Sequence, residues 1–362
     1  MAILIFVVIL CVLIVGHEAG HLIAAKLSKM KVLEFGIGFP PKLAGKTIGG
    51  TLYSVNALPF GGFVKILGEE GENANDPAAF STRPKLLQAM TIAAGPIANF
   101  VLAFLLTSFA FMIGVPVEAD PADLANVRDP QVVAAEILPG TPAETAGLRS
   151  GDRLMSLVGV DGVEMKVTTP EAFSSVVERA LEPLVLVYER NGAEASVEVT
   201  PVLGVIPEEP ERRALGIGLT MIGIISLPPH IAIAEGFMAT VRNTVLVAKG
   251  IAEFIGRAFS LQADLSAVSG PVGIVSSVGT TATFGVGALL SFAAIISINL
   301  GIVNLIPFPA LDGGRIAMIG VEALTRRKIP RAVANGLNFL GFALLILLML
   351  AVTVNDISHL VG

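Results

Sequence analysis

The sequence predicts a polytopic α-helical membrane protein with four transmembrane helices and one soluble β domain inserted between the second helix and the third. Composition is the first observation: 53% of the 362 residues are hydrophobic, 15% are charged, and the mean hydropathy is +0.77. Soluble globular chains carry about 25% charged residues, so the composition excludes a purely soluble enzyme, a coiled coil and a disordered chain. The other two observations are four long charge-free runs and a single polar region between the second run and the third.

The four charge-free runs are each long enough to cross a bilayer, which takes about 20 apolar residues. They cover residues 2–25, 86–116, 265–311 and 332–355, and the third is most apolar over 284–306. Only a short polar motif interrupts the first run. This run lacks the basic start and the small-residue cleavage site of a signal peptide. We therefore expect it to be retained as a membrane helix.

Residues 231–259 need a separate decision, because they are apolar enough to form a fifth span. At 100° per residue, their five charged residues fall within about 80° of one another; these are Glu235, Arg242, Lys249, Glu253 and Arg257. A one-sided stripe of charge is typical of an amphipathic helix that lies on the membrane surface. We predict an interfacial helix and its connection over residues 230–283, with a fifth span as the alternative.

The polar region indicates one soluble domain over residues 117–229. Stretches rich in β-branched residues predict four strands, at 131–138, 153–160, 184–190 and 193–203. Asn191-Gly192, between the last two strands, is a strong hairpin signal. Thr169 is placed to cap a helix over residues 170–181, which opens with proline. A short helix among strands indicates a small β-sandwich or an open barrel.

Charge asymmetry gives the chain an orientation in the membrane. Residues 26–85 hold eight Lys and Arg against five Asp and Glu, residues 313–331 hold five against one, and residues 118–230 hold eight against eighteen. Basic loops tend to stay on the cytoplasmic side, so we expect the acidic domain and both termini outside. The chain is then a multi-pass protein of the cell inner (cytoplasmic) membrane. The net charge of −6 gives no indication of a nucleic-acid partner.

The motif that interrupts the first run is His17-Glu18-Ala19-Gly20-His21. Residues i and i+4 share one face of a helix, so both imidazoles can reach one zinc ion. Glu18 lies beside them and can take a proton from water at the zinc. The alternative is a polar patch satisfied within a helix bundle, but ionisable groups inside a span are costly and usually functional. The motif therefore predicts a zinc site that hydrolyses its substrate.

A catalytic zinc ion needs a third protein ligand and one open position. Asp312 is the best candidate, since it ends the third run where Pro307 and Pro309 interrupt the helix and two glycines follow. Its alternative role is a helix cap before a cytoplasmic loop. At 1.5 Å per residue, His17 lies about 24 Å along its helix from Ala2, which puts it toward the cytoplasmic side. If residues 231–259 lie on the surface, Asp312 reaches a similar depth.

Together, these motifs resemble those of the site-2 protease family of intramembrane zinc metalloproteases, and within it the bacterial RseP/RasP-like group with one PDZ domain. HExxH precedes the segment Asn304-Leu-Ile-Pro307-Phe-Pro309-Ala-Leu-Asp312-Gly313-Gly314, as in the family. Two further family stretches are similar to Gly95-Pro96-Ile97-Ala98-Asn99 and Ser269-Gly270-Pro271-Val272-Gly273-Ile274. The polar domain resembles a PDZ domain in Pro139-Gly140-Thr141-Pro142-Ala143, Ala146-Gly147-Leu148 and Gly151-Asp152. The resemblance covers nearly the whole chain.

The resemblance implies roles for individual residues. The ligands of one catalytic Zn²⁺ ion would be His17, His21 and Asp312, with Glu18 as the general base. The residues placed against the substrate backbone would be Asn304, Pro307 and Pro309, together with Gly36, Ile37 and Gly38. These last three lie in residues 31–68, which would form a re-entrant β-hairpin whose edge binds substrate as an added strand. The alternative for this stretch is an ordinary cytoplasmic loop.

The domain boundaries follow from the same reasoning. The chain would consist of an N-terminal membrane part over 1–116, an extracytoplasmic PDZ-like domain over 117–229, the interfacial helix and connection over 230–283, and a C-terminal membrane part over 284–362. The PDZ-like domain would either bind a peptide tail along an edge strand at residues 131–137 or act as a steric gate. The sequence leaves both roles open.

Three functions compete at this point. The favoured one is an intramembrane zinc endopeptidase that cleaves single-span membrane proteins in the lipid bilayer, such as anti-sigma factors or signal-peptide remnants, in regulated intramembrane proteolysis. The second is a non-proteolytic membrane adaptor that uses its PDZ domain, and the intact Glu18 argues against it. The third is a transporter, against which four spans without detectable inverted repeats argue.

Overall fold

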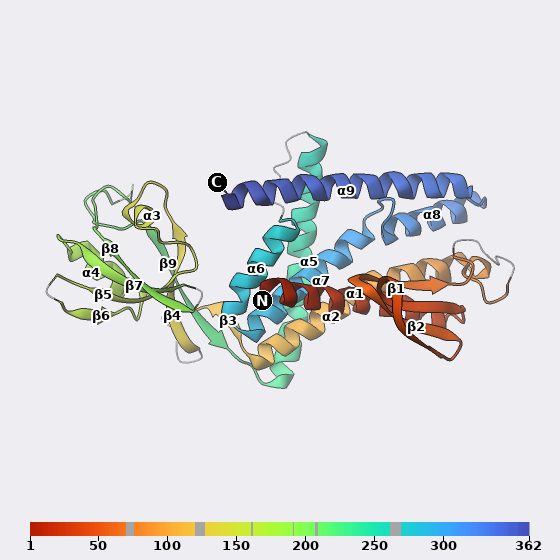
Figure 1. Cartoon of the computed structure of the whole chain (residues 1–362), viewed down its shortest axis with the longest axis horizontal. Helices are drawn as coiled ribbons and strands as arrows, with labels where there is room; N and C mark the ends of the chain where they lie inside the picture. Colours follow the sequence, from red (N-terminus) through yellow and green to blue (C-terminus); the bar gives the residue numbers. More distant parts are fainter. Residues whose placement is uncertain are drawn as a thin grey trace. The chain divides into compact units, whose positions relative to one another are not determined.

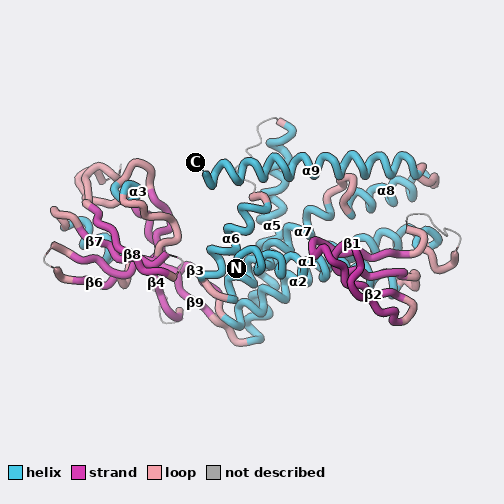
Figure 2. Tube along the Cα trace, in the orientation of Figure 1, coloured by secondary structure: helices cyan, strands magenta, loops and turns pink. Residues whose placement is uncertain are grey.

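A computed structural model describes residues 1–69, 76–119, 127–160, 162–190, 192–206, 209–260 and 269–361. The chain divides into two compact units, whose elements are labelled in Figure 1. The membrane unit comprises residues 1–110, 229–282 and 289–362, and the β unit comprises residues 111–228 with 283–288. Figure 2 shows that the strands form two separate groups, and each group belongs to one of the units.

Five helices in the described part of the chain are long and apolar enough to cross a membrane. They are α1 (Ala2–Leu27), α2 (Lys85–Ile113), α5 (Pro229–Phe259), α7 (Val286–Leu305) and α9 (Arg331–Val361). The expected third run is divided between α6 (Pro271–Thr283) and α7, with Gly285 at a φ of +92° between them. Because α5 is also long enough to span, the count of four, with α5 on the surface, stays a prediction.

Helices α1 and α2 pack closely because small residues line their contact. A Cβ on Gly20 would lie 2.3 Å from the carbonyl oxygen of Ala94, so only glycine allows this approach. Small residues of this kind let membrane helices come together. The Ser297 hydroxyl of α7 donates a hydrogen bond to the backbone oxygen of Asn99 in α2, at 2.8 Å. Three helices therefore meet beside the polar motif of α1.

The expected hairpin is present in residues 31–68 and is folded back on itself. Its strands, β1 (Val32–Ile48) and β2 (Thr51–Ile66), turn at Gly49 and Gly50, both of which have positive φ. The paired residues define four short segments in the order 62–66, 32–37, 51–56 and 42–48. Segment 32–37 therefore has neighbours on both sides. Segment 62–66 stands at one end of this order and is paired with segment 32–37.

The β unit contains a sheet of seven described strands in the order β3-β9-β4-β5-β7-β8, with β6 paired to β5. The strands are β3 (Val115–Glu118), β4 (Arg128–Ile137), β5 (Arg153–Val158), β6 (Glu164–Lys166), β7 (Leu184–Arg190), β8 (Ala193–Val199) and β9 (Ile217–Ile225). Two helices, α3 (Pro142–Thr145) and α4 (Pro170–Arg179), complete it. Phe173 and Val177 of α4 are buried in one core with Leu157 and Leu186 of the sheet.

Local signals predicted four of the seven described strands of the β unit and helix α4, whereas β3, β6, β9 and α3 were not predicted. The four expected strands correspond to β4, β5, β7 and β8. The hairpin between β7 and β8 is confirmed, and Gly192 in its turn has a positive φ. Asn191, the other residue of the expected turn, lies outside the described residues. The Thr169 hydroxyl accepts a hydrogen bond from the N–H of Ala172 at 3.1 Å, so it caps α4 as expected. The expected free edge at residues 131–137 was wrong, because β4 is hydrogen-bonded to β9 on one side and to β5 on the other.

Asp152 in the β unit is a structural residue. Its buried carboxylate accepts hydrogen bonds from Arg190 Nε at 2.6 Å and from the N–H of Arg149 at 2.8 Å. The bond to Asp152 also raises the pKa of the Arg190 guanidinium above its ordinary value. A buried carboxylate with these partners fixes the turn that precedes β5. Gly151-Asp152 thus belongs to the framework of this unit.

Candidate metal centre

The two histidines of HExxH lie on one face of α1, one turn apart. Their Nε2 atoms are 3.2 Å apart, and their rings meet edge to face with centroids 4.8 Å apart. The Nδ1 of His21 donates to the backbone oxygen of Thr91 in α2, at 2.9 Å. With its proton on Nδ1, a neutral His21 ring directs the Nε2 lone pair toward His17. The helix therefore brings two ring nitrogens to one point, as the i, i+4 spacing predicted.

Asp312 reaches the same point from the start of α8 (Asp312–Thr325). Its Oδ2 lies 3.1 Å from His17 Nε2 and 3.3 Å from His21 Nε2. Helix α7 ends at Leu305, and Pro307 and Pro309 lie in the irregular segment before α8. The residue at the cap position of α8 is not Asp312 but the one before it, and no side chain caps this helix. The capping alternative for Asp312 is therefore wrong.

The two glycines after Asp312 let α8 begin directly against the preceding loop. A Cβ on Gly313 would lie 2.2 Å from the backbone oxygen of Ile306, and a Cβ on Gly314 would lie 2.2 Å from that of Phe308. Neither backbone oxygen could move away cheaply. The Asp-Gly-Gly sequence is therefore needed to bring this aspartate to the histidines.

The three side chains fit a zinc ion. Asp312 Oδ2 is buried and has no hydrogen-bond partner among the described residues, and its neighbours are ring nitrogens. Tetrahedral zinc with bonds of about 2.0–2.2 Å separates adjacent ligand atoms by about 3.3–3.6 Å, close to the observed 3.1–3.3 Å. A Cβ on Gly95 would lie 2.3 Å from His21 Nε2 and 2.8 Å from His17 Nε2. Glycine at this position keeps the space beside the nitrogens open.

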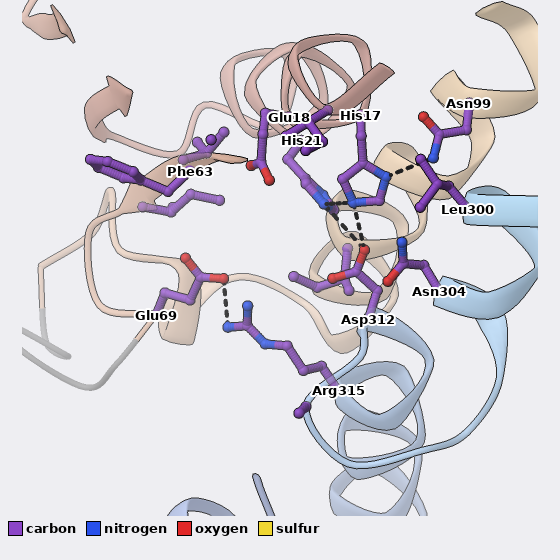
Figure 3. Close-up of a pocket in the computed structure, with 16 residues that line it drawn as sticks. His17, Glu18, His21, Phe63, Glu69, Asn99, Leu300, Asn304, Asp312 and Arg315 are labelled. Atoms are coloured by element: carbon purple, nitrogen blue, oxygen red, sulfur yellow. Dashed lines mark hydrogen bonds and ion pairs between the residues drawn. The ribbon is translucent and has the colours of Figure 1, made fainter. Parts of the chain in front are cut away.

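A cavity of about 370 Å³ opens beside these ligands. Figure 3 shows that the carboxylate of Glu18 points into it, next to His21. Across the cavity, Glu69, three residues after the end of β2, pairs with Arg315 of α8, at 2.5 Å. The ion pair ties the hairpin to the helix that carries Asp312. The site is thus a polar pocket enclosed by α1, α2, β2, α7 and α8.

The structure brings most, but not all, of the expected site residues together. His17, Glu18, His21, Asn304 and Asp312 all line the cavity. The hairpin instead contributes Gly62, Phe63, Val64 and Ile66 of β2. The described lining does not include Gly36, Ile37, Gly38, Pro307 or Pro309.

Two residues of α2 beside the ligands were not assigned a role from the sequence. They are Gly95, described above, and Asn99, whose side-chain nitrogen lies 3.1 Å from His17 Nδ1. The signal was available, because both belong to the GPxxN stretch and are separated by four residues, as are the two histidines. Their contact with α1 could not be read from either segment alone.

The fold and the site define a class of protein: a membrane-embedded zinc metalloprotease, with an HExxH helix and a carboxylate gathered inside an apolar helical unit. Residues 5–348 match the sequence model of Peptidase family M50. The chain belongs to this family, that of the site-2 proteases. This membership confirms the resemblance to the site-2 protease family that was drawn from the HExxH and Asp-Gly-Gly motifs.

The chain is also similar to proteins called zinc metalloprotease RasP in three bacteria. It is 31% identical to that of Geobacillus kaustophilus, over 98% of this chain and 97% of the relative. It is 30% identical to that of Oceanobacillus iheyensis, over 98% of each protein. For Shouchella clausii the identity is 28%, again over 98% of each. These relatives confirm zinc as the cofactor and a metalloprotease as the kind of enzyme.

Proposed function

We propose that this protein is an intramembrane endopeptidase, which hydrolyses peptide bonds within or near the transmembrane segments of single-span membrane proteins. Anti-sigma factors and signal-peptide remnants are the substrates expected in regulated intramembrane proteolysis. One observation carries the proposal: Asp312 comes together with His17 and His21 on α1, a helix that is long and apolar enough to span a membrane. A site at this depth serves substrates that lie in the bilayer.

In this proposal His17, His21 and Asp312 hold one zinc ion and Glu18 is the general base. Bound zinc polarises the scissile carbonyl and acidifies a water molecule. Glu18, beside His17 in the same cavity, accepts the proton that the attacking water loses. It then gives this proton to the amine that leaves, so one carboxylate serves as base and as acid.

The substrate helix must be opened before its backbone can react, and we propose that segment 62–66 of β2 does this. It stands at one end of the hairpin's segment order, and its residues Gly62, Phe63, Val64 and Ile66 line the cavity, so an extended substrate could add beside them as a strand. A Cβ on Gly62 would lie 3.2 Å from Glu18 Cγ, which places this edge beside the base. Asn304 would hold the same substrate backbone from α7.

The residues first expected at that edge then have a supporting role. Gly36 pairs with Phe63, and Ile37 pairs with Gly62. A Cβ on Gly36 would lie 2.4 Å from the ring of Phe63. Gly36, Ile37 and Gly38 would thus lie in or next to the strand that pairs with segment 62–66 and would fix its register, and they would not contact the substrate themselves.

For the β unit we propose a PDZ-like role in which the peptide tail pairs with the start of β9 and not with residues 131–137. A cavity of about 160 Å³ lies between α4 and the start of β9, lined by Phe173, Val177 and Leu219. An extended peptide tail could pair with β9 there and place apolar side chains against α4. The steric gate is the competing role. Loss of substrate binding in Val177→Arg would favour peptide capture, whereas faster cleavage of substrates with bulky outer domains would favour a gate.

We further propose the inner-membrane topology that the charges predict, with four spans, a re-entrant hairpin over 31–68, α5 on the surface, and both termini and the β unit outside. The supporting observation is the basic character of residues 26–85 and 313–331. A cysteine at Gly250, which has open space around it, can be tested in a Cys11→Ser background. Labelling of α5 by an impermeant maleimide supports a surface helix, and protection supports a fifth span.

Cleavage by purified protein tests the central proposal. The full chain in detergent should cut a single-span substrate, and a zinc chelator should stop it. Glu18→Gln should retain zinc, while turnover falls by about 100- to 10,000-fold. An adaptor would bind such a substrate without cutting it, and near-normal turnover of Glu18→Gln would remove Glu18 from the mechanism.

A further inference from the structure

Helix α2 presents one polar face to the two histidines of α1. Thr91, Gly95 and Asn99 follow one another at intervals of four residues and so share a face of the helix. The Thr91 carbonyl accepts the Nδ1–H of His21, Gly95 leaves room for both Nε2 atoms, and Asn99 meets Nδ1 of His17. Each histidine therefore has its outer nitrogen paired with α2 and its inner nitrogen directed at the cavity.

We propose that Asn99 is a positioning residue for the metal centre: its side-chain amide accepts the Nδ1–H of His17 and thereby directs Nε2 to the zinc. The proposal rests on the ligand set of the proposed function. Asn99 does not touch the reacting atoms and acts only through His17.

Imidazole chemistry requires such a partner. A neutral ring that binds metal through Nε2 carries its proton on Nδ1, and this N–H needs an acceptor when it is buried. Asn99 is fully buried, its side-chain nitrogen is 3.1 Å from Nδ1 of His17, and in the part of the chain that the structure describes its Oδ1 has no hydrogen-bond partner. The amide thus has an acceptor available, and rotation of its end group brings that acceptor to Nδ1.

An asparagine suits this position because it accommodates either form of the ring. If His17 carries its proton on Nε2, its Nδ1 is an acceptor and can receive the N–H of Asn99 Nδ2 at 3.1 Å. If the proton is on Nδ1, the same side chain accepts through Oδ1. An aspartate could serve only the second form, which is the one that binds metal, and a leucine could serve neither.

Zinc affinity of the full-length chain tests the proposal directly. The metal-free protein in detergent competes with a chromophoric chelator for Zn²⁺, and the Co²⁺-loaded protein reports ligand geometry by its visible absorption. Asn99→Leu should bind Zn²⁺ about 10- to 100-fold more weakly and change the Co²⁺ spectrum. Asn99→Asp should bind at least as tightly as the unaltered chain, because the acceptor is restored.

Gln88→Leu is the matched control, since Gln88 is a buried amide on the same helix that donates to the backbone oxygen of Arg83. It should leave zinc affinity unchanged. Thermal unfolding of each metal-free variant separates metal loss from misfolding, and Asn99→Ala replaces Asn99→Leu if the latter does not fold.

Two results would overturn the inference. The first is an unchanged zinc affinity in Asn99→Leu. The second is an Asn99→Asp variant that binds zinc as weakly as Asn99→Leu, which would mean that Asn99 acts only through its packing. His17→Ala distinguishes this failure from a failure of the ligand set. If His17→Ala keeps full zinc affinity, the ligand set is wrong and the inference fails with it. If only His17→Ala loses zinc, the ligand set stands and Asn99 has no positioning role.

Discussion

Two largely buried aspartates of the membrane unit use their carboxylates in opposite ways. Asp356, near the end of α9, accepts hydrogen bonds from the N–H of Gly270 at 3.1 Å and of Gly273 at 2.8 Å. Asp312 directs Oδ2 at two imidazole nitrogens and has no hydrogen-bond partner for that atom. One carboxylate is satisfied by backbone donors, and the other lies among groups that also offer lone pairs.

The difference separates a structural aspartate from the proposed metal ligand in the same apolar surroundings. Buried polar groups are normally paired, so an unpaired buried oxygen needs a reason. Asp356 lies at the start of α6, where free N–H groups and the helix dipole favour a negative charge, and it joins α9 to α6. Asp312 has no such donors, and a cation between it and the histidines would supply what they lack.

The largest effect should come from Asp312→Asn, which keeps the shape of the side chain and removes its charge. Zinc affinity should fall by more than the roughly 10- to 100-fold typical of losing an outer-shell partner, and cleavage should fall to background. Metal content after dialysis and cleavage of a single-span substrate are the measurements. Full activity in this variant would remove Asp312 from the site and with it the contrast between the two aspartates.

Gly95→Ala should also remove the zinc, although no ligand is changed. The new Cβ would lie within 2.3 Å of His21 Nε2, where it displaces the ring or fills the metal space. Alanine favours helix over glycine by about 1 kcal/mol, so α2 should persist. Gly320→Ala, on an exposed turn of α8 with nothing within 4 Å, is the matched control and should keep both zinc and activity. Tight zinc binding in Gly95→Ala would show that the rings have room that the structure does not provide.

A smaller loss should follow from Asn304→Ala, which extends the comparison from carboxylates to amides. Asn304 lines the cavity, whereas the half-buried Asn299 on the same helix is not among the residues described as lining it and donates to the backbone oxygen of Ile295. Removing the side chain leaves a buried group of the substrate backbone unpaired, at a cost of about 1–3 kcal/mol, so cleavage should slow by about 5- to 150-fold with zinc still bound. Substrates with a stable leucine-rich helix should suffer most. Equal rates for Asn304→Ala and Asn299→Ala would leave Asn304 without a substrate role.

The sequence could predict the parts of this site that depend on local spacing. HExxH on one helix fixes two ring nitrogens, and the depth argument brought Asp312 to the same level. The substrate edge could not be predicted in this way, because the pairing of segment 62–66 depends on how the hairpin folds back. The contact of Asn99 with His17 depends on the packing of α1 against α2, since neither helix carries a local signal for its partner.

The smallest effect should come from Asp356→Asn, which tests the other half of the comparison. The amide keeps one acceptor but turns a donor toward one of the two backbone N–H groups, so a charge-assisted hydrogen bond is lost at a cost of about 1.5–3 kcal/mol. Thermal unfolding should begin at a lower temperature, while zinc affinity stays unchanged because the proposed ligands are untouched.

Gly270→Ala should cause a similar loss of stability from the other partner of this contact, since its Cβ would lie 2.7 Å from Asp356 Oδ2. Because both variants break one contact, the double variant should be little worse than either. Thr353→Ala, whose hydroxyl bonds only its own helix at Met349, should be nearly neutral. Loss of zinc in Asp356→Asn would mean that the satisfied aspartate also supports the metal centre, and the distinction between the two carboxylates would fail.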